Sequence, residues 1–198
     1  MRSHVFPLAI ISLFNPICFV ALQTPHSTQG AALASASRQM QDGVRKEVPE
    51  ACPVTKPPAQ PFVPPPPYWT DHGTDAFWFG TRKLWILLPN NGTWHVLPID
   101  SQGQIAHAAR DITAYSQKLA WYREGYDWRS DPQREQPMMK VTGERQGAPA
   151  PPLAAHANTV TARPPHIMVG VDIPTLGCWK ITGHFEDTEL SFVVWVVV

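Results

Sequence analysis

Short stretches in which hydrophobic and polar residues alternate dominate the chain from residue 68 onward. Alternation with a period of two is typical of strands that bury one face, and Gly, Asn, Asp and Pro separate these stretches. Residues 105–116 fit either a short helix or a loop. The pattern predicts strands over residues 76–79, 83–88, 93–99, 117–124, 138–144, 159–161 and 167–171.

The C-terminal segment carries the clearest pattern. Residues 178–185 and 189–198 flank the polar turn 186–188, which predicts a hairpin. Trp179 begins a hydrophobic face on the first strand, since alternate side chains point to the same side. The second strand is hydrophobic on both faces from Phe192 onward, as is typical of a strand in the middle of a sheet.

Another hairpin is predicted around the sequence Asn90-Asn91-Gly92. Asn and Gly tolerate the positive φ angles that a tight turn needs. The turn would pair residues 83–88 with residues 93–99.

The N-terminus has the pattern of a secretory signal. Arg2 precedes residues 5–22, which form a hydrophobic run of 18 residues without a charge. Residues 34–36 read Ala-Ser-Ala, so we expect a signal peptide within residues 1–36, cleaved between positions 21 and 36. The alternatives are an uncleaved anchor helix, which prolines in the run disfavour, and lipidation at Cys18, whose preceding residues do not match a lipobox.

Residues 37–67 are predicted to form a tether. The first part is polar and has no hydrophobic period, so we expect it to be disordered. Proline then occupies eight of the fifteen positions from 53 to 67. Such a run favours the polyproline II conformation and a semi-rigid spacer, and the alternative is a ligand for a proline-binding module.

Composition and charge limit the classes of function. The chain has 16 Lys and Arg against 16 Asp and Glu, without the basic excess that nucleic-acid binding requires, so no nucleic acid is expected as a partner. The 22 prolines disfavour long helices. No hydrophobic run after the signal reaches the ~20 residues of a membrane helix, so we expect no membrane span in the mature chain.

The mature chain would keep two cysteines, Cys52 and Cys178. An even pair in an exported protein favours a disulfide, and the alternative is two free thiols. Without a Cys-x-x-Cys motif, neither a redox site nor a cysteine zinc site is predicted.

Several segments together resemble a family of uncharacterised bacterial exported proteins. Those proteins end in Pro-x-x-Gly-Cys-Trp-x-[Ile/Val]-Thr-Gly, then a short turn and Leu-Ser-Phe-Val-Val. The matching segments are residues 173–183, 189–194, 52–55, 77–80, 84–85 and 92–94. The resemblance implies export and no particular activity.

The entry into the C-terminal hairpin is also distantly similar to immunoglobulin-like domains. Pro174, Gly177 and Trp179 match a pattern whose aromatic residue is usually Tyr, bonding back to the backbone. Residues 68–198 are long enough for an immunoglobulin-like antiparallel sandwich of about seven to nine strands.

Catalytic motifs are missing from the sequence. It contains no Gly-x-Ser-x-Gly elbow, Walker loop or His-Glu-x-x-His, so no enzymatic activity, cofactor or metal is predicted. Aromatic residues on or near a polar segment are the remaining candidates for ligand binding, since sugars stack on exposed rings and loops often carry function. They are Trp121, Tyr122, Tyr126 and Trp128.

These observations predict an exported, non-enzymatic β-sandwich. It would lie in the periplasm, on the cell surface or outside the cell, and contact another envelope protein or a surface glycan. The alternative is a carbohydrate-binding module that uses the aromatic residues near 121–128.

Overall fold

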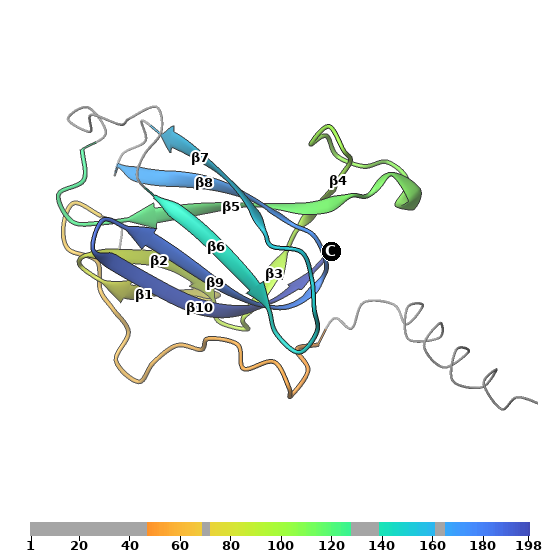
Figure 1. Cartoon of the computed structure of the whole chain (residues 1–198). Coiled ribbons are helices and arrows are strands. Elements are labelled where there is room, and N and C mark those ends of the chain that lie inside the picture. The colour runs from red at the N-terminus through yellow and green to blue at the C-terminus, as the bar shows by residue number, and fades with distance from the viewer. Residues whose placement is uncertain (1–46, 69–71, 128–138, 161–164) are drawn as a thin grey trace, which may run out of the picture. The chain divides into compact units, whose positions relative to one another are not determined.

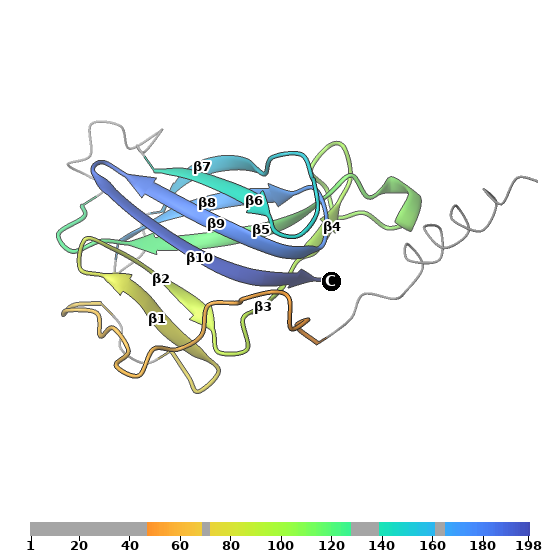
Figure 2. The same cartoon turned by 60° about the horizontal axis from the view of Figure 1, so that its bottom comes forward.

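The computed structural model describes residues 47–68, 72–127, 139–160 and 165–198, which form two β-sheets packed together as a sandwich (Figures 1 and 2). The first sheet has the order β1-β2-β5-β8-β7, with β4 also paired to β5. Its strands are β1 (Ala76–Thr81), β2 (Leu84–Pro89), β4 (Leu97–Ile99), β5 (Ala114–Tyr122), β7 (Ala154–Val160) and β8 (His166–Ile173). The second sheet has the order β3-β10-β9-β6. Its strands are β3 (Thr93–His95), β6 (Lys140–Arg145), β9 (Gly177–Phe185) and β10 (Thr188–Val197).

The all-β prediction is confirmed, and the described residues contain ten strands rather than seven to nine. Within residues 105–116 the chain forms a single 3₁₀ turn at Ala109–Asp111 before β5 begins. The additional strand arises because residues 93–99 divide between the two sheets. β7 begins at Ala154, before the predicted position 159.

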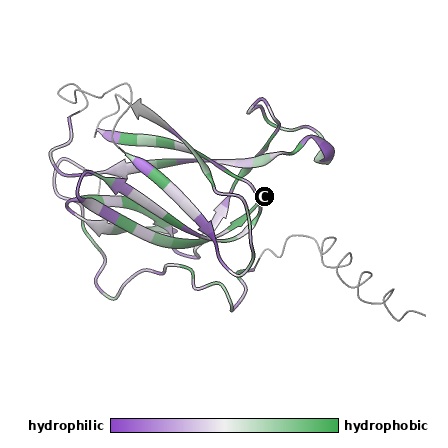
Figure 3. Cartoon of the chain, viewed as in Figure 1, coloured by the Kyte–Doolittle hydropathy of each residue, from purple (hydrophilic) through white to green (hydrophobic). Residues whose placement is uncertain are grey.

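The core lies between the two sheets. Burial alternates along β8 and along parts of β9 and β10, so one face of each sheet supplies buried side chains to the core. Figure 3 shows hydrophobic and hydrophilic residues mixed along the strands. On β8 every second residue is buried. The largest side chains that are fully buried there are Trp121, Trp179, Phe192, Leu84, Leu88, Ile167, Ile173 and Ile181.

The predicted C-terminal hairpin is confirmed. β9 and β10 pair antiparallel from Thr188↔Phe185 to Val196↔Gly177. β10 lies between β9 and β3, so the strand that is hydrophobic on both faces is central, as predicted. Trp179 is fully buried, and its Nε1 donates to the Thr175 carbonyl at 2.8 Å.

The hairpin predicted around Asn90-Asn91-Gly92 is wrong. After this turn the chain crosses to the other sheet, where β3 pairs parallel with β10 rather than with β2. The crossing buries Trp94 against Phe192 of β10, with ring centroids 5.5 Å apart. The chain then returns at Val96, and β4 pairs with β5.

The predicted tether packs against the sandwich instead of standing away from it. Residues from 47 onward belong to the same compact unit as the strands, and we call residues 52–68 the strap. Thr55 anchors its first half to β10: the Thr55 N–H donates to the Val193 carbonyl and the Val193 N–H donates to Thr55 Oγ1, both at 2.9 Å. The domain therefore begins before residue 68, whereas residues 37–46 lie outside the described part.

Two further contacts fix the strap. The predicted disulfide is present and joins Cys52 to Cys178 at the start of β9, with a Cα–Cα distance of 5.6 Å. Val54 lies so close to Gly92 that a Cβ at this glycine would come within 2.5 Å of it. With its φ of +68°, Gly92 therefore meets two demands at once, a left-handed turn and close approach of the strap.

Candidate functional site

The predicted aromatic residues lie in three different surroundings. Trp121 is fully buried in the core, so it cannot contact an external ligand, and its candidacy for ligand binding is contradicted. Its neighbour Tyr122 points to the opposite face of β5 and is half-buried. Tyr126 is 8% exposed, with its ring 6.2 Å from the ring of Phe185. Trp128 lies outside the described residues.

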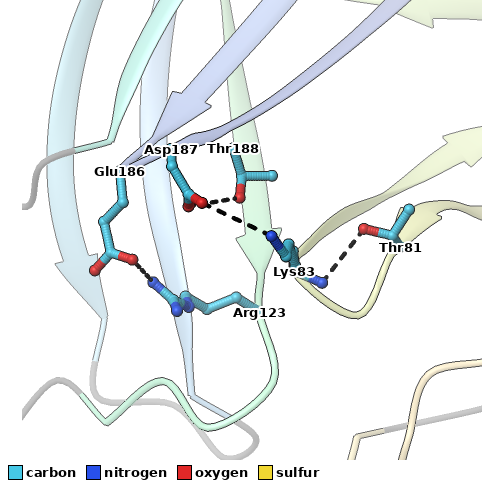
Figure 4. Close-up of polar contacts among 6 residues, drawn as sticks. All are labelled: Thr81, Lys83, Arg123, Glu186, Asp187 and Thr188. Atoms are coloured by element: carbon cyan, nitrogen blue, oxygen red, sulfur yellow. Dashed lines mark hydrogen bonds and ion pairs between the residues drawn. The ribbon is translucent and has the colours of Figure 1, made fainter.

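Ion pairs hold the segment that follows β5 against neighbouring turns (Figure 4). The Arg123 guanidinium donates to the Glu186 carboxylate at 2.6 Å and also lies over the ring of Phe185, 4.9 Å from its centroid. Asp187, in the same turn as Glu186, pairs with Lys83 at 3.7 Å. Residues 123–126 are therefore held against the sandwich by these contacts and do not form an open binding loop.

Tyr122 belongs to a second hydrophobic cluster, on the outer face of the first sheet. Its ring stacks on Trp85 with centroids 6.1 Å apart and meets Trp78 edge-on at 5.4 Å. The strap covers this cluster with Phe62 and Tyr68, whose hydroxyl donates to the Arg123 carbonyl at 2.6 Å. Burial raises the pKa of both tyrosines above the ordinary value. The cluster is thus an intramolecular docking surface for the strap.

Beside this cluster the first sheet is split. β2 and β5 pair only at Trp85↔Tyr122 and Ile86↔Trp121. Beyond these pairs β2 continues to Pro89 and β5 extends back to Ala114, but the two strands no longer pair with each other. Farther along, β5 pairs with β4 from Leu97↔Ser116. Positions 117–120 of β5 therefore have a strand partner on the β8 side and none on the other side among the described pairings.

The split forms an open groove with a volume of about 270 Å³. Sites that enclose whole drug-sized ligands usually have about 300–1,000 Å³, so the groove matches one or two inserted side chains. Its lining is hydrophobic toward the core and mixed at the mouth. The residues that line it are Ile86, Leu87, Trp94, Gln117, Lys118, Leu119, Ala120 and Tyr122.

Two polar side chains at the groove differ in whether they have a partner. The Gln117 carboxamide is engaged at both ends: its Oε1 accepts the Lys118 N–H at 2.9 Å and its Nε2 donates to the His95 carbonyl at 3.3 Å. The Lys118 ammonium is exposed and forms no ion pair with the described residues. The groove therefore presents one uncompensated positive charge beside a hydrophobic interior.

Groups suited to metal binding do not gather in the described part of the chain. His156 lies 3.0 Å from Asp172 on the outer face of the first sheet, and His184 lies 3.3 Å from Glu189 at the end of the second. The groove lining contains neither a carboxylate nor an imidazole. The polar groups among the lining residues are the Gln117 carboxamide, the Lys118 ammonium and the Tyr122 phenol.

The fold defines the class of this protein as a disulfide-linked β-sandwich. Disulfides persist in oxidising compartments, which agrees with export. No helix in the described ranges has the length and hydrophobicity needed to cross a membrane.

No family model matches the sequence, and no curated protein or solved structure matches it significantly. The similarity of its segments to exported proteins and to immunoglobulin-like domains thus stays a prediction.

Sequence reasoning missed the groove, because a groove that results from missing strand pairing has no motif. One local signal was present. The alternation of Leu119 and Trp121 places both on the buried face of β5, which leaves Lys118, Ala120 and Tyr122 on the outer face.

Proposed function

We propose that this protein is an exported, non-catalytic binding domain that holds a partner protein of the cell envelope at the groove between β2 and β5. The observation that carries the proposal is the interrupted ladder on the side of β5 that faces away from β8. On that side β5 pairs with β2 at one end and with β4 at the other, and it has no strand partner at positions 117–120. A sheet in which one strand lacks a ladder partner over several positions, beside a hydrophobic interior, is a surface that can accept another chain.

The hydrophobic surface at the mouth supports the same function. Leu87 is 37% exposed and lies directly opposite Trp78 of β1, so it continues the outer aromatic cluster beyond the part that the strap covers. Leu97, 58% exposed, lies beside Ser116 at the other end of the groove. Exposed hydrophobic side chains at both ends of a groove favour a protein ligand.

Site-specific cross-linking in the producing cells tests the proposal. A photo-reactive amino acid at position 87 should give a discrete adduct, which Lys118→Glu should weaken. The matched control is position 180, an exposed lysine position on the central strand β9 of the other sheet. Adducts of equal yield at positions 87 and 180, or none at position 87, would refute a binding role for the groove.

A further inference from the structure

We propose that the partner segment binds as an added β-strand along positions 117–120 of β5, with a hydrophobic side chain in the groove and acidic side chains beside Lys118. This inference rests on the proposed function and names the chemistry of its ligand. It follows from three features of the groove: the direction of its backbone groups, the present role of Gln117, and the charge at its mouth.

The backbone of β5 faces the groove at alternate residues. In an antiparallel ladder, the N–H and C=O of one residue point to the same neighbouring strand, and those of the next residue point to the opposite one. The Lys118 N–H donates to Gln117 Oε1, whose carboxamide reaches back to His95, so the amide of Lys118 points to the groove and not to β8. Alternation then directs the backbone groups of Ala120 to the groove, and Tyr122 continues the series where it meets Trp85.

Gln117 occupies the place of a missing strand. Its carboxamide accepts from Lys118 on one side and donates to His95 on the other, as the peptide group of an intervening strand would. A side-chain carboxamide can rotate away, because its two hydrogen bonds are at the protein surface and water can replace them. The incoming strand would take over the Lys118 N–H and extend the pairing to Ala120, about 6.8 Å along β5.

Side-chain alternation then fixes the chemistry of the ligand. A residue of the added strand opposite Leu119 points inward, where Ile86, Leu119 and Trp94 are at most 6% exposed, so it must be hydrophobic. Its two neighbours point outward on the side of Lys118 and Ala120. The ammonium of Lys118 has no ion pair with described residues, so acidic neighbours gain a charge-assisted contact there. The preferred segment is acidic–hydrophobic–acidic and extended.

The test uses the full chain with its disulfide intact, labelled with ¹⁵N, and the probe peptide acetyl-Thr-Glu-Val-Glu-Thr-amide. We expect the probe to shift the amide resonances of Lys118 and Ala120. Methylating the two glutamate amides, which would face β5, should weaken binding by about tenfold or more, since each removes a backbone hydrogen bond. Methylating the valine amide, which faces away from β5, is the matched control and should weaken binding far less.

Charge is tested with a second pair of variants. Lys118→Glu should lower the affinity for the probe about threefold to tenfold, and Lys180→Glu, an equivalent change on the other sheet, should leave it unchanged. A probe with lysines in place of the glutamates should show the reverse preference between the wild type and Lys118→Glu.

Several outcomes would overturn the inference. These are equal affinities of the two methylated isomers, resonance shifts confined to the edge strands β6 or β7, and no shift at millimolar probe. Shifts at Lys118 and Ala120 caused by cellohexaose and not by the peptide would make the groove a glycan site. An adduct at position 87 without peptide binding would remove strand pairing and keep the protein-binding role, whereas the loss of both would remove the proposed function as well.

Discussion

Removing the Cys52–Cys178 disulfide should destabilise the domain strongly while leaving its native structure in place. The perturbation is the double variant Cys52→Ala/Cys178→Ala, which leaves neither cysteine of the disulfide as a free thiol. The two cysteines are 126 positions apart, and in the loop-entropy model freeing a loop of this length costs about 5 kcal/mol at 25 °C. This value is comparable with the whole free energy of unfolding of a small domain.

The native structure should survive because the strap has other attachments. Thr55 keeps its two hydrogen bonds to Val193, and Phe62 and Tyr68 keep their ring contacts with Trp85. The lost stability therefore comes from the greater freedom of the unfolded chain. For a domain of this size we expect the melting temperature to fall by about 10–20 °C.

Urea unfolding followed by tryptophan fluorescence measures the effect. The free energy of unfolding should fall by about 5 kcal/mol, and the slope with urea should rise because the uncrosslinked chain exposes more surface. Thr55→Val, which removes only the side-chain hydrogen bond to Val193, serves as the control and should cost about 1 kcal/mol. A loss below about 2 kcal/mol, or a changed native emission spectrum, contradicts the assignment of the effect to the unfolded state.

Three other substitutions have defined outcomes. Gly183→Ala should lower the free energy of unfolding by about 1–3 kcal/mol in urea, because its Cβ would collide with the Trp121 ring; an unchanged midpoint would contradict this close packing. Lys83→Ala should change it by less than about 0.5 kcal/mol, because its ion pair is largely exposed; a larger loss would show a structural role. Burial raises the pKa of Tyr68 and Tyr122, so stability is full below about pH 10, where the unfolded phenols are protonated, and falls as pH rises through the folded pKa. Replacing both by Phe should flatten that decline in urea midpoints measured between about pH 8 and pH 11, and a decline that stays as steep would assign it to other groups.

The parts of the fold that depend on local pattern could be predicted from the sequence. The β9–β10 hairpin joins segments only two residues apart, and its alternation is strong enough to identify the buried face through Trp179. Pairing between distant segments could not be predicted in this way. Thr93–His95 has the same alternation whether it pairs with β2 or with β10, and the burial of Trp94 against Phe192 decides the outcome.

The candidate site shows the same limit. Aromatic residues near 121–128 are candidates by composition, yet Trp121 and Tyr126 are buried because each finds a partner from a distant strand. The proline-rich segment has the composition of a spacer, but it contains Phe62 and Tyr68 at the spacing that reaches Trp85. Only the packed structure shows which polar or aromatic side chains remain accessible.

The central position of β10 also determines when the domain can close. During synthesis β10 is made after every other described strand, and until it arrives β3 has no partner and β9 lacks one of its two neighbours. Cys52 likewise waits for Cys178, which lies at the start of β9, the strand made just before β10. Pairing that spans about 100 residues makes folding slow compared with local hairpins. Completion of the second sheet and disulfide formation thus become late, coupled events.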